Sequence, residues 1–400
     1  MSEVLRLVEF QMCLLLFVAL SGSLLASRLG QSAVVGEILL GVLVGPSLLG
    51  LVTYTDFVAG LAQLGAVFLL FVIGTEFRLQ DVARPRYLLI GTCGVLMPFG
   101  MGWLAADLLG FPFGSAMFVA AALTATSVAI TAGVLKELGK LHTAAARAII
   151  GAAVIDDVLG LLALAATRGV VAGSVTAAGV ALALAKAVLF LASGGLAGRF
   201  LLVPLLGRLD RTSFTRRFRE APFLFAVTCA FLYAAAAELV GLSAIVGAFM
   251  AGASLGGVRL RHGKDLHAGF ESLKDIFSAI FFVSLGVLTD VRAADPRVLV
   301  LLGVLLAVAF ASKLAGCGGA ALLTGSSLKD ATIIGLGMVP RGEVAMIVAL
   351  TGLNSGRIGQ GVYVTIILLG LLTTVATPLV LRPLLGPSRA APPAVPAPRS

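Results

Sequence analysis

Long runs of apolar residues follow one another along the chain, separated by short stretches that hold most of its charges. Most runs have about 20 residues, the length at which an α-helix crosses the roughly 30 Å hydrocarbon core of a bilayer. None alternates apolar and polar residues as a barrel strand does, so we predict helices, whose backbone hydrogen bonds close internally. Thirteen segments are predicted: 8–27, 33–51, 58–77, 87–108, 112–135, 144–168, 171–203, 221–240, 242–257, 267–289, 297–323, 329–352 and 358–385. The pattern indicates an all-α polytopic membrane protein with about 13 transmembrane helices.

The composition supports this class and excludes others. Of 400 residues, 59% are hydrophobic and 12% are charged, and the mean hydropathy is +1.07, whereas about a quarter of the residues in soluble domains are charged. An ordinary soluble enzyme, a disordered chain and a nucleic-acid-binding protein are therefore excluded. Because the predicted segments take up most of these 400 residues, we expect no soluble domain among them. We expect residues 386–400, rich in proline and alanine, to form a disordered cytoplasmic tail.

The basic residues predict the orientation of the chain. With the N-terminus outside, the loops that fall inside hold 20 Lys and Arg residues and the outer loops hold 5. Cytoplasmic loops carry such an excess, so we expect the N-terminus outside and the C-terminus in the cytoplasm. The four cysteines lie singly in apolar runs, which favours neither a zinc site nor a disulfide framework, and no cofactor is expected.

Three charged residues fall near the middle of predicted spans. Asp156 and Asp157 lie at the centre of segment 144–168, and Lys313 lies near the middle of segment 297–323. A charge at the bilayer centre costs at least about 2.5–3.5 kcal/mol, so such residues are functional candidates by default. Adjacent carboxylates on a helix point about 100° apart but can border one cavity, where they can hold protons or a hard cation. An ion pair with one aspartate would keep Lys313 charged.

Two other spans carry irregular or polar sequence at their centres. In GLGMVPRGEVAMIVAL, glycines and Pro340 interrupt a predicted helix, with Arg341 and Glu343 at the break. Broken helices near the bilayer midplane mark ion sites in transporters, because the ends of the half-helices carry partial charges. The second segment is ALTATSVAIT, whose hydroxyl cluster also has the alternative of bonding its own helix. That cluster contains Thr124, Thr126, Ser127 and Thr131.

The broken span and the hydroxyl-rich span are seven segments apart, as are the spans before them and the spans after them. An offset of seven in a chain of thirteen spans places two six-helix halves around the seventh. Because the offset is odd, one half is inverted relative to the other. This is the inverted-repeat plan of secondary transporters.

These residues together resemble the cation:proton antiporter-2 family, within the sodium/proton exchanger superfamily, over roughly residues 8–385. VVGEILLGVLVGPSLLG and LGAVFLLFVIGTEFRL are similar to its second and third spans, although Thr75 stands where leucine is expected. TATSVAIT and MVPRGEVAMIVA resemble its two crossing helices, and AAVIDDVLGLL resembles its ion-site helix. The resemblance implies the sodium/proton antiporter fold, with two inverted repeats and two broken crossing helices.

The resemblance also implies roles for the midplane charges. The aspartate at the position of Asp157 binds the cation, and the one at Asp156 pairs with Lys313. Asp156 would act either as a second Na⁺ ligand or as the group that releases the lysine. Core helices at about 87–168 and 297–385 would move, elevator-like, against scaffold and dimerisation helices at about 8–77 and 221–289, with a linker helix at about 171–203.

We therefore expect an antiporter of the bacterial inner membrane, not an enzyme, that exchanges Na⁺ or Li⁺ for protons electrogenically. Thr126 and Ser127 would complete an oxygen shell around the cation, and Glu343 and Arg341 would hold the broken helix together. The expected partners are the bilayer, the transported ions and a second copy of the chain.

Three other functions are compatible with parts of this pattern. Potassium/proton exchange stays open, although Kef-type relatives carry Gln-Asp at this position and a nucleotide-binding domain, and this sequence has neither. A channel or a sensor subunit also stays open. An intramembrane aspartyl protease is disfavoured, because its two aspartates must lie on different helices and share a proton.

Overall fold

The structure, a computed structural model, describes residues 7–29, 31–75, 84–172, 177–256, 258, 266–288 and 296–386. Within these ranges every regular element is a helix, and each of the thirteen predicted segments contains one. The predicted tail from residue 387 onward lies outside the described residues. The first half holds α1 (Val8–Arg28), α2 (Ala33–Val44), α3 (Asp56–Thr75), α5 (Pro85–Leu108), α6 (Phe113–Thr124), α7 (Val128–Glu137), α8 (Ala144–Ala172), α9 (Ala177–Ala197), η2 (Gly198–Leu202) and α10 (Val203–Asp210).

The second half follows with α11 (Ser213–Arg217), α12 (Ala221–Leu239), α13 (Ala244–Leu255), α14 (Leu266–Val287), α15 (Pro296–Lys313), η4 (Leu314–Gly318), α16 (Gly319–Leu323), α17 (Leu328–Gly337), α18 (Glu343–Asn354) and α19 (Gln360–Leu385). In the described part of the chain, nine helical stretches are long and apolar enough to cross a membrane, and three shorter apolar helices accompany them. The all-helical membrane architecture is thus confirmed, and the number of crossings stays a prediction.

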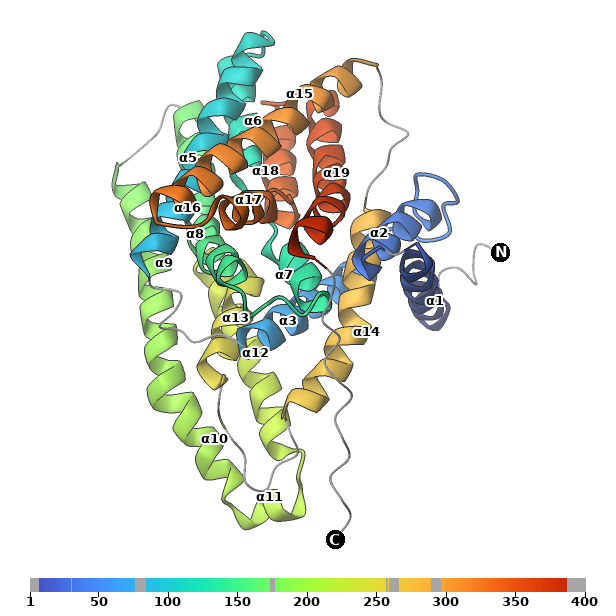
Figure 1. The fold of residues 1–400 in the computed structure, drawn as a ribbon, viewed down its shortest axis with the longest axis vertical. Coiled ribbons are helices and arrows are strands. Elements are labelled where there is room, and N and C mark those ends of the chain that lie inside the picture. Colours follow the sequence, from blue (N-terminus) through green and yellow to red (C-terminus); the bar gives the residue numbers. More distant parts are fainter. Residues whose placement is uncertain are drawn as a thin grey trace.

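The helices form two groups, which we call the first and the second helix group. The first group contains α1, α2, α3, α12, α13 and α14, which pack chiefly on one another. The second group contains α5 to α8 and α15 to α19. In Figure 1 the second group fills the upper part of the view, and α3, α12, α13 and α14 lie below it.

Glycine lets the helices of the first group approach closely. Where α3 crosses α13, Gly74 faces Gly252, and a Cβ atom on Gly74 would lie 3.1 Å from the Cα atom of Gly252 and 3.0 Å from the backbone nitrogen of Ala253. A side chain there would force the two backbones apart. Small residues serve this purpose in membrane helices, where van der Waals packing replaces the hydrophobic drive between helices.

One long helix differs from the predicted span. The sequence places its end at residue 203, before Pro204, but the helix continues through η2 and α10 to Asp210. A proline inside a helix removes one backbone hydrogen bond and crowds the preceding turn. Here that preceding turn is the π-helical η2, whose wider spacing accommodates the ring. The same apolar face continues with Leu202 and Leu206, which are both buried.

The second group repeats one plan twice. An unbroken helix, a broken helix and another unbroken helix follow in order as α5, α6–α7 and α8, and again as α15–α16, α17–α18 and α19. Both predicted breaks are present: α6 ends at Thr124 and α7 begins at Val128, while α17 ends at Gly337 and α18 begins at Glu343. The two breaks meet inside the second group, and buried polar side chains of the predicted spans lie around them.

Candidate functional site

The extended segments of the two breaks are hydrogen-bonded to each other. The backbone N–H of Ser127 donates to the carbonyl oxygen of Pro340 at 2.8 Å, and Thr126 Oγ1 donates to the carbonyl of Met338 at 3.3 Å. One turn further on, Thr131 Oγ1 donates to the carbonyl of Gly337 at 2.6 Å. Backbone that leaves the helix inside a membrane must find such partners. Thr126 and Thr131 of the predicted hydroxyl cluster therefore bond across to the other broken helix, whereas Thr124 Oγ1 donates to the carbonyl of Ala121 in its own helix, the alternative stated for the cluster.

Arg341 is among the largest fully buried side chains, at 1% exposure. Its Nη1 donates to the carbonyl of Ala125 at 3.0 Å and to that of Met338 at 3.3 Å, one carbonyl from each break. The two segments approach so closely here that a Cβ atom on Gly342 would lie 2.7 Å from Ser127 Oγ. Arg341 thus bonds a backbone carbonyl of each break, and its predicted role in holding the broken helix together stays a prediction. Glu343 begins α18, and its side chain lies outside the described part of the structure.

Lys313 and Asp156 form a buried ion pair beside the crossing. Lys313 Nζ lies 2.9 Å from Asp156 Oδ1, and the two side chains are 0% and 1% exposed. The same ammonium group donates to the carbonyls of Gly94 at 2.7 Å and Thr124 at 3.1 Å. All three of its donors are therefore used, which compensates part of the cost of burying the charge.

Gly94 allows this pair to form. A Cβ atom at that position would lie 2.5 Å from Cys317 Sγ and 3.4 Å from Asp156 Oδ1, so only glycine lets α5 pack against the lysine. Gly94 could not be singled out from the sequence, because a single glycine among 48 carries no pattern.

Asp157 points in a different direction from Asp156, as adjacent residues on a helix must. Its side chain is partly exposed and lines a cavity of about 560 Å³ between the two helix groups. Apolar side chains of both groups form most of the wall, and the polar lining includes Gln63 in the first half of α3 and Glu238 at the end of α12. The two neighbouring aspartates thus have different surroundings, one sealed in an ion pair and the other on a cavity.

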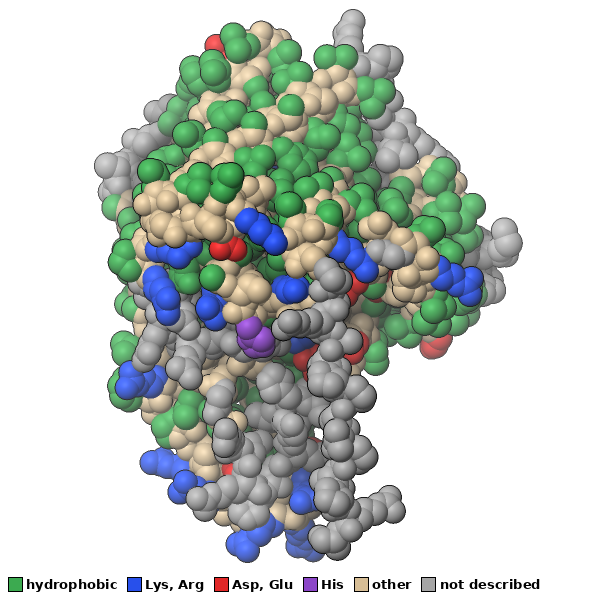
Figure 2. All heavy atoms as spheres, in the orientation of Figure 1, with side chains coloured by type: hydrophobic (Ala, Val, Ile, Leu, Met, Phe, Trp, Pro, Cys, Tyr) green, Lys and Arg blue, Asp and Glu red, His purple; other side chains and the backbone are tan. Residues whose placement is uncertain are grey.

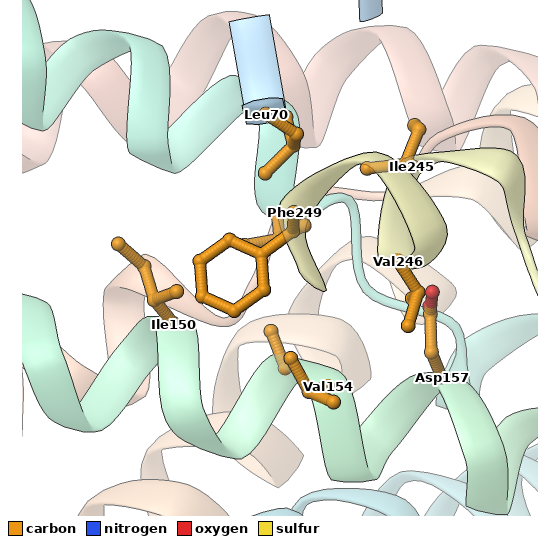
Figure 3. A pocket seen from close by; sticks show the side chains of 9 residues that line it. Leu70, Ile150, Val154, Asp157, Ile245, Val246 and Phe249 are labelled. Atoms are coloured by element: carbon orange, nitrogen blue, oxygen red, sulfur yellow. The ribbon is translucent and has the colours of Figure 1, made fainter. Parts of the chain in front are cut away.

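Toward the other end of the molecule, apolar side chains close the space beside Asp157. Figure 3 shows the Asp157 carboxyl group next to Val246, with Val154, Ile150 and Phe249 lying beyond it. The void among these residues is about 10 Å³, no more than a single water molecule needs. Because Ile150 and Val154 belong to the second group and Val246 and Phe249 to the first, the two groups are in contact here.

A second cavity, of about 660 Å³, lies past this apolar contact and has a charged lining. Lys136 Nζ on α7 lies 2.8 Å from Glu271 Oε1 on α14, an ion pair that joins the second group to the first. Glu137 on α7 accepts hydrogen bonds from Ser32 Oγ and from the backbone N–H of Ala33, 3.2 Å away, at the start of α2. Polar contacts therefore link the two helix groups at the end where Asp157 is closed off.

Both the sequence and the fold are similar to those of known proteins. Residues 14–386 match the family model described as "Sodium/hydrogen exchanger, transmembrane". The Na(+)/H(+)-K(+) antiporter GerN of Bacillus cereus is 33% identical over 93% of this chain and 95% of its own length. The chain belongs to the sodium/hydrogen exchanger family. The resemblance drawn from the sequence motifs is thereby confirmed.

Other antiporters that are similar to this chain also match it over most of its length. The high-affinity Na(+)/H(+) antiporter NhaS3 of Synechocystis is 31% identical, over 94% of this chain and 89% of its own length. The K(+)/H(+) antiporter subunit KhtU of Bacillus subtilis is 27% identical, over 84% and 83%. The solved structure of the sodium proton antiporter MjNhaP1 from Methanocaldococcus jannaschii superimposes with a TM-score of 0.65 at 18% identity, covering 93% of this chain and 94% of that one, which shows the shared fold.

The buried ion pair predicts a non-additive effect on stability. Lys313→Met leaves the Asp156 carboxylate without its cation, which costs on the order of 3–5 kcal/mol if the charge persists and less if the carboxyl group takes up a proton. Lys313→Met combined with Asp156→Asn removes both charges. We expect thermal unfolding in detergent to show the double variant as more stable than Lys313→Met alone. Lys329→Met, at an exposed position, is the control. Additive effects of the two single substitutions would contradict the pairing.

Proposed function

We propose that this protein exchanges a monovalent cation, sodium in the first place, for protons, with Asp157 as the carrier. The observation that carries the proposal is that one aspartate lies on a large cavity while its neighbour is held by Lys313. A proton and a cation compete for the same carboxylate, so binding one expels the other. Exchange is then obligatory once access to the carboxylate alternates between the two sides. The family relationship supports cation/proton antiport as such.

In this proposal, oxygen atoms of the crossing supply further ligands for the cation. Ser127 Oγ is buried and has no hydrogen-bond partner among the described residues, and a carbonyl oxygen at the breaks has two lone pairs, so one that accepts a single hydrogen bond can still coordinate a cation. Such oxygen ligands suit hard cations. Asp156 joins as a second ligand or, by giving up its pairing, releases Lys313. Thr126, whose hydroxyl donates to Met338, has an oxygen lone pair left for the same purpose.

Alternating access is the mechanism that the two ends of the molecule support. One end has a cavity reaching Asp157, and the other is closed by apolar contact and by the Lys136–Glu271 pair. In the predicted orientation the cavity that reaches Asp157 opens outside. On the face seen in Figure 2, Lys and Arg side chains gather across the middle and lower parts of the view, which the positive-inside rule assigns to the cytoplasmic side. We propose that the second helix group moves as the core against the first, which acts as scaffold and dimer interface.

Potassium is the second candidate substrate. The relative KhtU is a K(+)/H(+) antiporter subunit, and the name of GerN includes K(+). Both ions take oxygen ligands, so the donor set at Asp157 suits either. The direct experiment measures proton flux in everted membrane vesicles by fluorescence dequenching, with sodium, lithium and potassium added in turn. A response to none of the three ions would overturn the proposal.

Removing the charge of Asp157 should abolish exchange. Asp157→Asn keeps the shape of the side chain but can neither carry a proton nor attract a cation as a carboxylate does. We expect no dequenching on sodium addition and a melting temperature close to that of the unaltered protein. The control is Asp107→Asn, at an exposed position in the last turn of α5. Exchange at the original rate and cation affinity would exclude Asp157 as the carrier.

A cross-link between the two helix groups at the closed end should stop cation/proton exchange. Lys136→Cys with Glu271→Cys, in a background without the native cysteines, places two thiols across the boundary between the helix groups. We expect a short bis-methanethiosulfonate reagent to arrest exchange and a reductant to restore it. The matched control is Ser23→Cys with Glu37→Cys, a hydrogen-bonded pair within the first group, whose cross-link should leave exchange intact. Full exchange after complete cross-linking of 136 to 271 would refute movement between the groups.

Electrogenic exchange follows if Lys313 loses its proton when the cation binds. Two protons then return for one cation, and each cycle moves one net charge, worth about 2.3 kcal/mol per 100 mV. An imposed membrane potential should therefore change the sodium-driven rate in liposomes. If Lys313 stays charged throughout, one proton is exchanged for one cation. A rate independent of a valinomycin-clamped potential, without a transient current on a supported membrane, would identify that electroneutral cycle.

A further inference from the structure

The backbone of the second break has specific hydrogen-bonding needs. Between Gly337 and Glu343 the chain leaves the helix while buried, so each N–H and C=O group requires a partner. The N–H groups of Met338 and Val339 reach back into α17, and the carbonyl of Pro340 accepts from Ser127 in the other break. Arg341 is the next residue. Its backbone N–H does not reach back into α17, and its carbonyl does not accept from the first break, so both groups need other partners.

Two consecutive threonines of α19 take up both backbone groups of Arg341. Its N–H donates to Thr373 Oγ1 at 3.1 Å, and its carbonyl accepts from Thr374 Oγ1 at 3.2 Å. Thr373 can act as acceptor because its own hydroxyl proton is directed to the carbonyl of Leu369 at 2.8 Å. The threonines are 0% and 3% exposed, so water does not replace these bonds. One hydroxyl accepts and the next donates, which matches the two groups of a single residue.

Arg341, whose backbone groups are bonded to Thr373 and Thr374, is also the residue that bridges the two breaks. Through Nη1, Arg341 bonds the carbonyls of Ala125 and Met338, so the position of its backbone sets the position of the guanidinium group and of both carbonyls. We propose that Thr373 and Thr374 are positioning residues of the ion site: they fix Arg341, and through it the geometry of the crossing, in the form that binds the cation. This inference rests on the proposed antiport at Asp157.

A buried threonine with an ordinary structural role makes a different hydrogen bond from those of Thr373 and Thr374. Thr365, also on α19 and also 0% exposed, donates to the carbonyl of Gly361 one turn back in its own helix. That is the common fate of a hydroxyl in a membrane helix, and it reaches no other element. Thr365 therefore provides a control with the same residue type, helix and burial but no bond to the break.

The test compares three valine substitutions, which keep the shape of threonine and remove its hydroxyl. In proteoliposomes, Thr373→Val and Thr374→Val should each raise the half-saturating sodium concentration roughly threefold to tenfold, the effect of losing one buried hydrogen bond. Thr365→Val should leave it unchanged. Thr373→Ser and Thr374→Ser retain the hydroxyl and should restore the original value. Half-saturation in Thr373→Val and Thr374→Val equal to that of Thr365→Val, with only the amount of folded protein reduced, would overturn the inference.

Two further measurements keep the outcomes distinct. If the valine variants do not fold, Thr373→Cys and Thr374→Cys replace them, since a thiol is a weak donor and acceptor and should give a smaller increase in half-saturation. An unchanged value in both cysteine variants would also overturn the inference. The unaltered protein is measured alongside: its failure to exchange any monovalent cation refutes the proposed antiport itself, whereas normal exchange with unaffected variants refutes only the role of the threonines.

Discussion

Backbone that leaves a helix inside a membrane must find every hydrogen-bond partner within the protein, and the centre of this structure follows from that requirement. Each break supplies part of what the other lacks, as in the bond from Ser127 N–H to Pro340 C=O. The remainder comes from side chains, notably the guanidinium group of Arg341 and the hydroxyl of Thr131. Neither break would be stable alone, so the crossing exists only as a unit with the helices α5, α8 and α19 around it.

This dependence explains how much of the site was predictable. Gly335, Pro340 and Gly342 are local signals, and they predicted the second break in the sequence. The midplane position of Asp156 and Lys313 predicted an ion pair, because an unpaired charge there is costly. Which aspartate would pair did not follow from helix geometry alone, since it depends on how α15 packs against α8; the family resemblance pointed to Asp156, and the structure contains that pair.

Other features required contacts between residues far apart in the chain. Thr373 and Thr374 lie in an apolar run where hydroxyls usually bond their own helix, and their partner is 32 or 33 residues away. Gly94 matters only because Lys313 and Cys317, more than 200 residues later, occupy the space beside it. The helix through Pro204 was predicted to end early because nothing in its sequence showed that the preceding turn is a π-helix. Hydrophobic periodicity, and the glycine and proline residues that interrupt it, indicate local structure. The features above depend instead on contacts between residues far apart in the chain.

The charges around the crossing constrain the exchange cycle further. Among the described side chains there, Lys313 and Arg341 are the cations and Asp156 and Asp157 the anions. An arginine stays protonated in proteins, so Arg341 contributes one fixed positive charge in every state. With all four groups ionised the set is neutral, and a bound monovalent cation raises it to one positive charge. Protonation of Asp157 gives the same total, so a one-for-one exchange never changes the buried charge.

If Lys313 instead releases its proton on cation binding, the cation-loaded site becomes neutral. Its crossing of the membrane is then insensitive to voltage, and the proton-loaded step alone senses the potential.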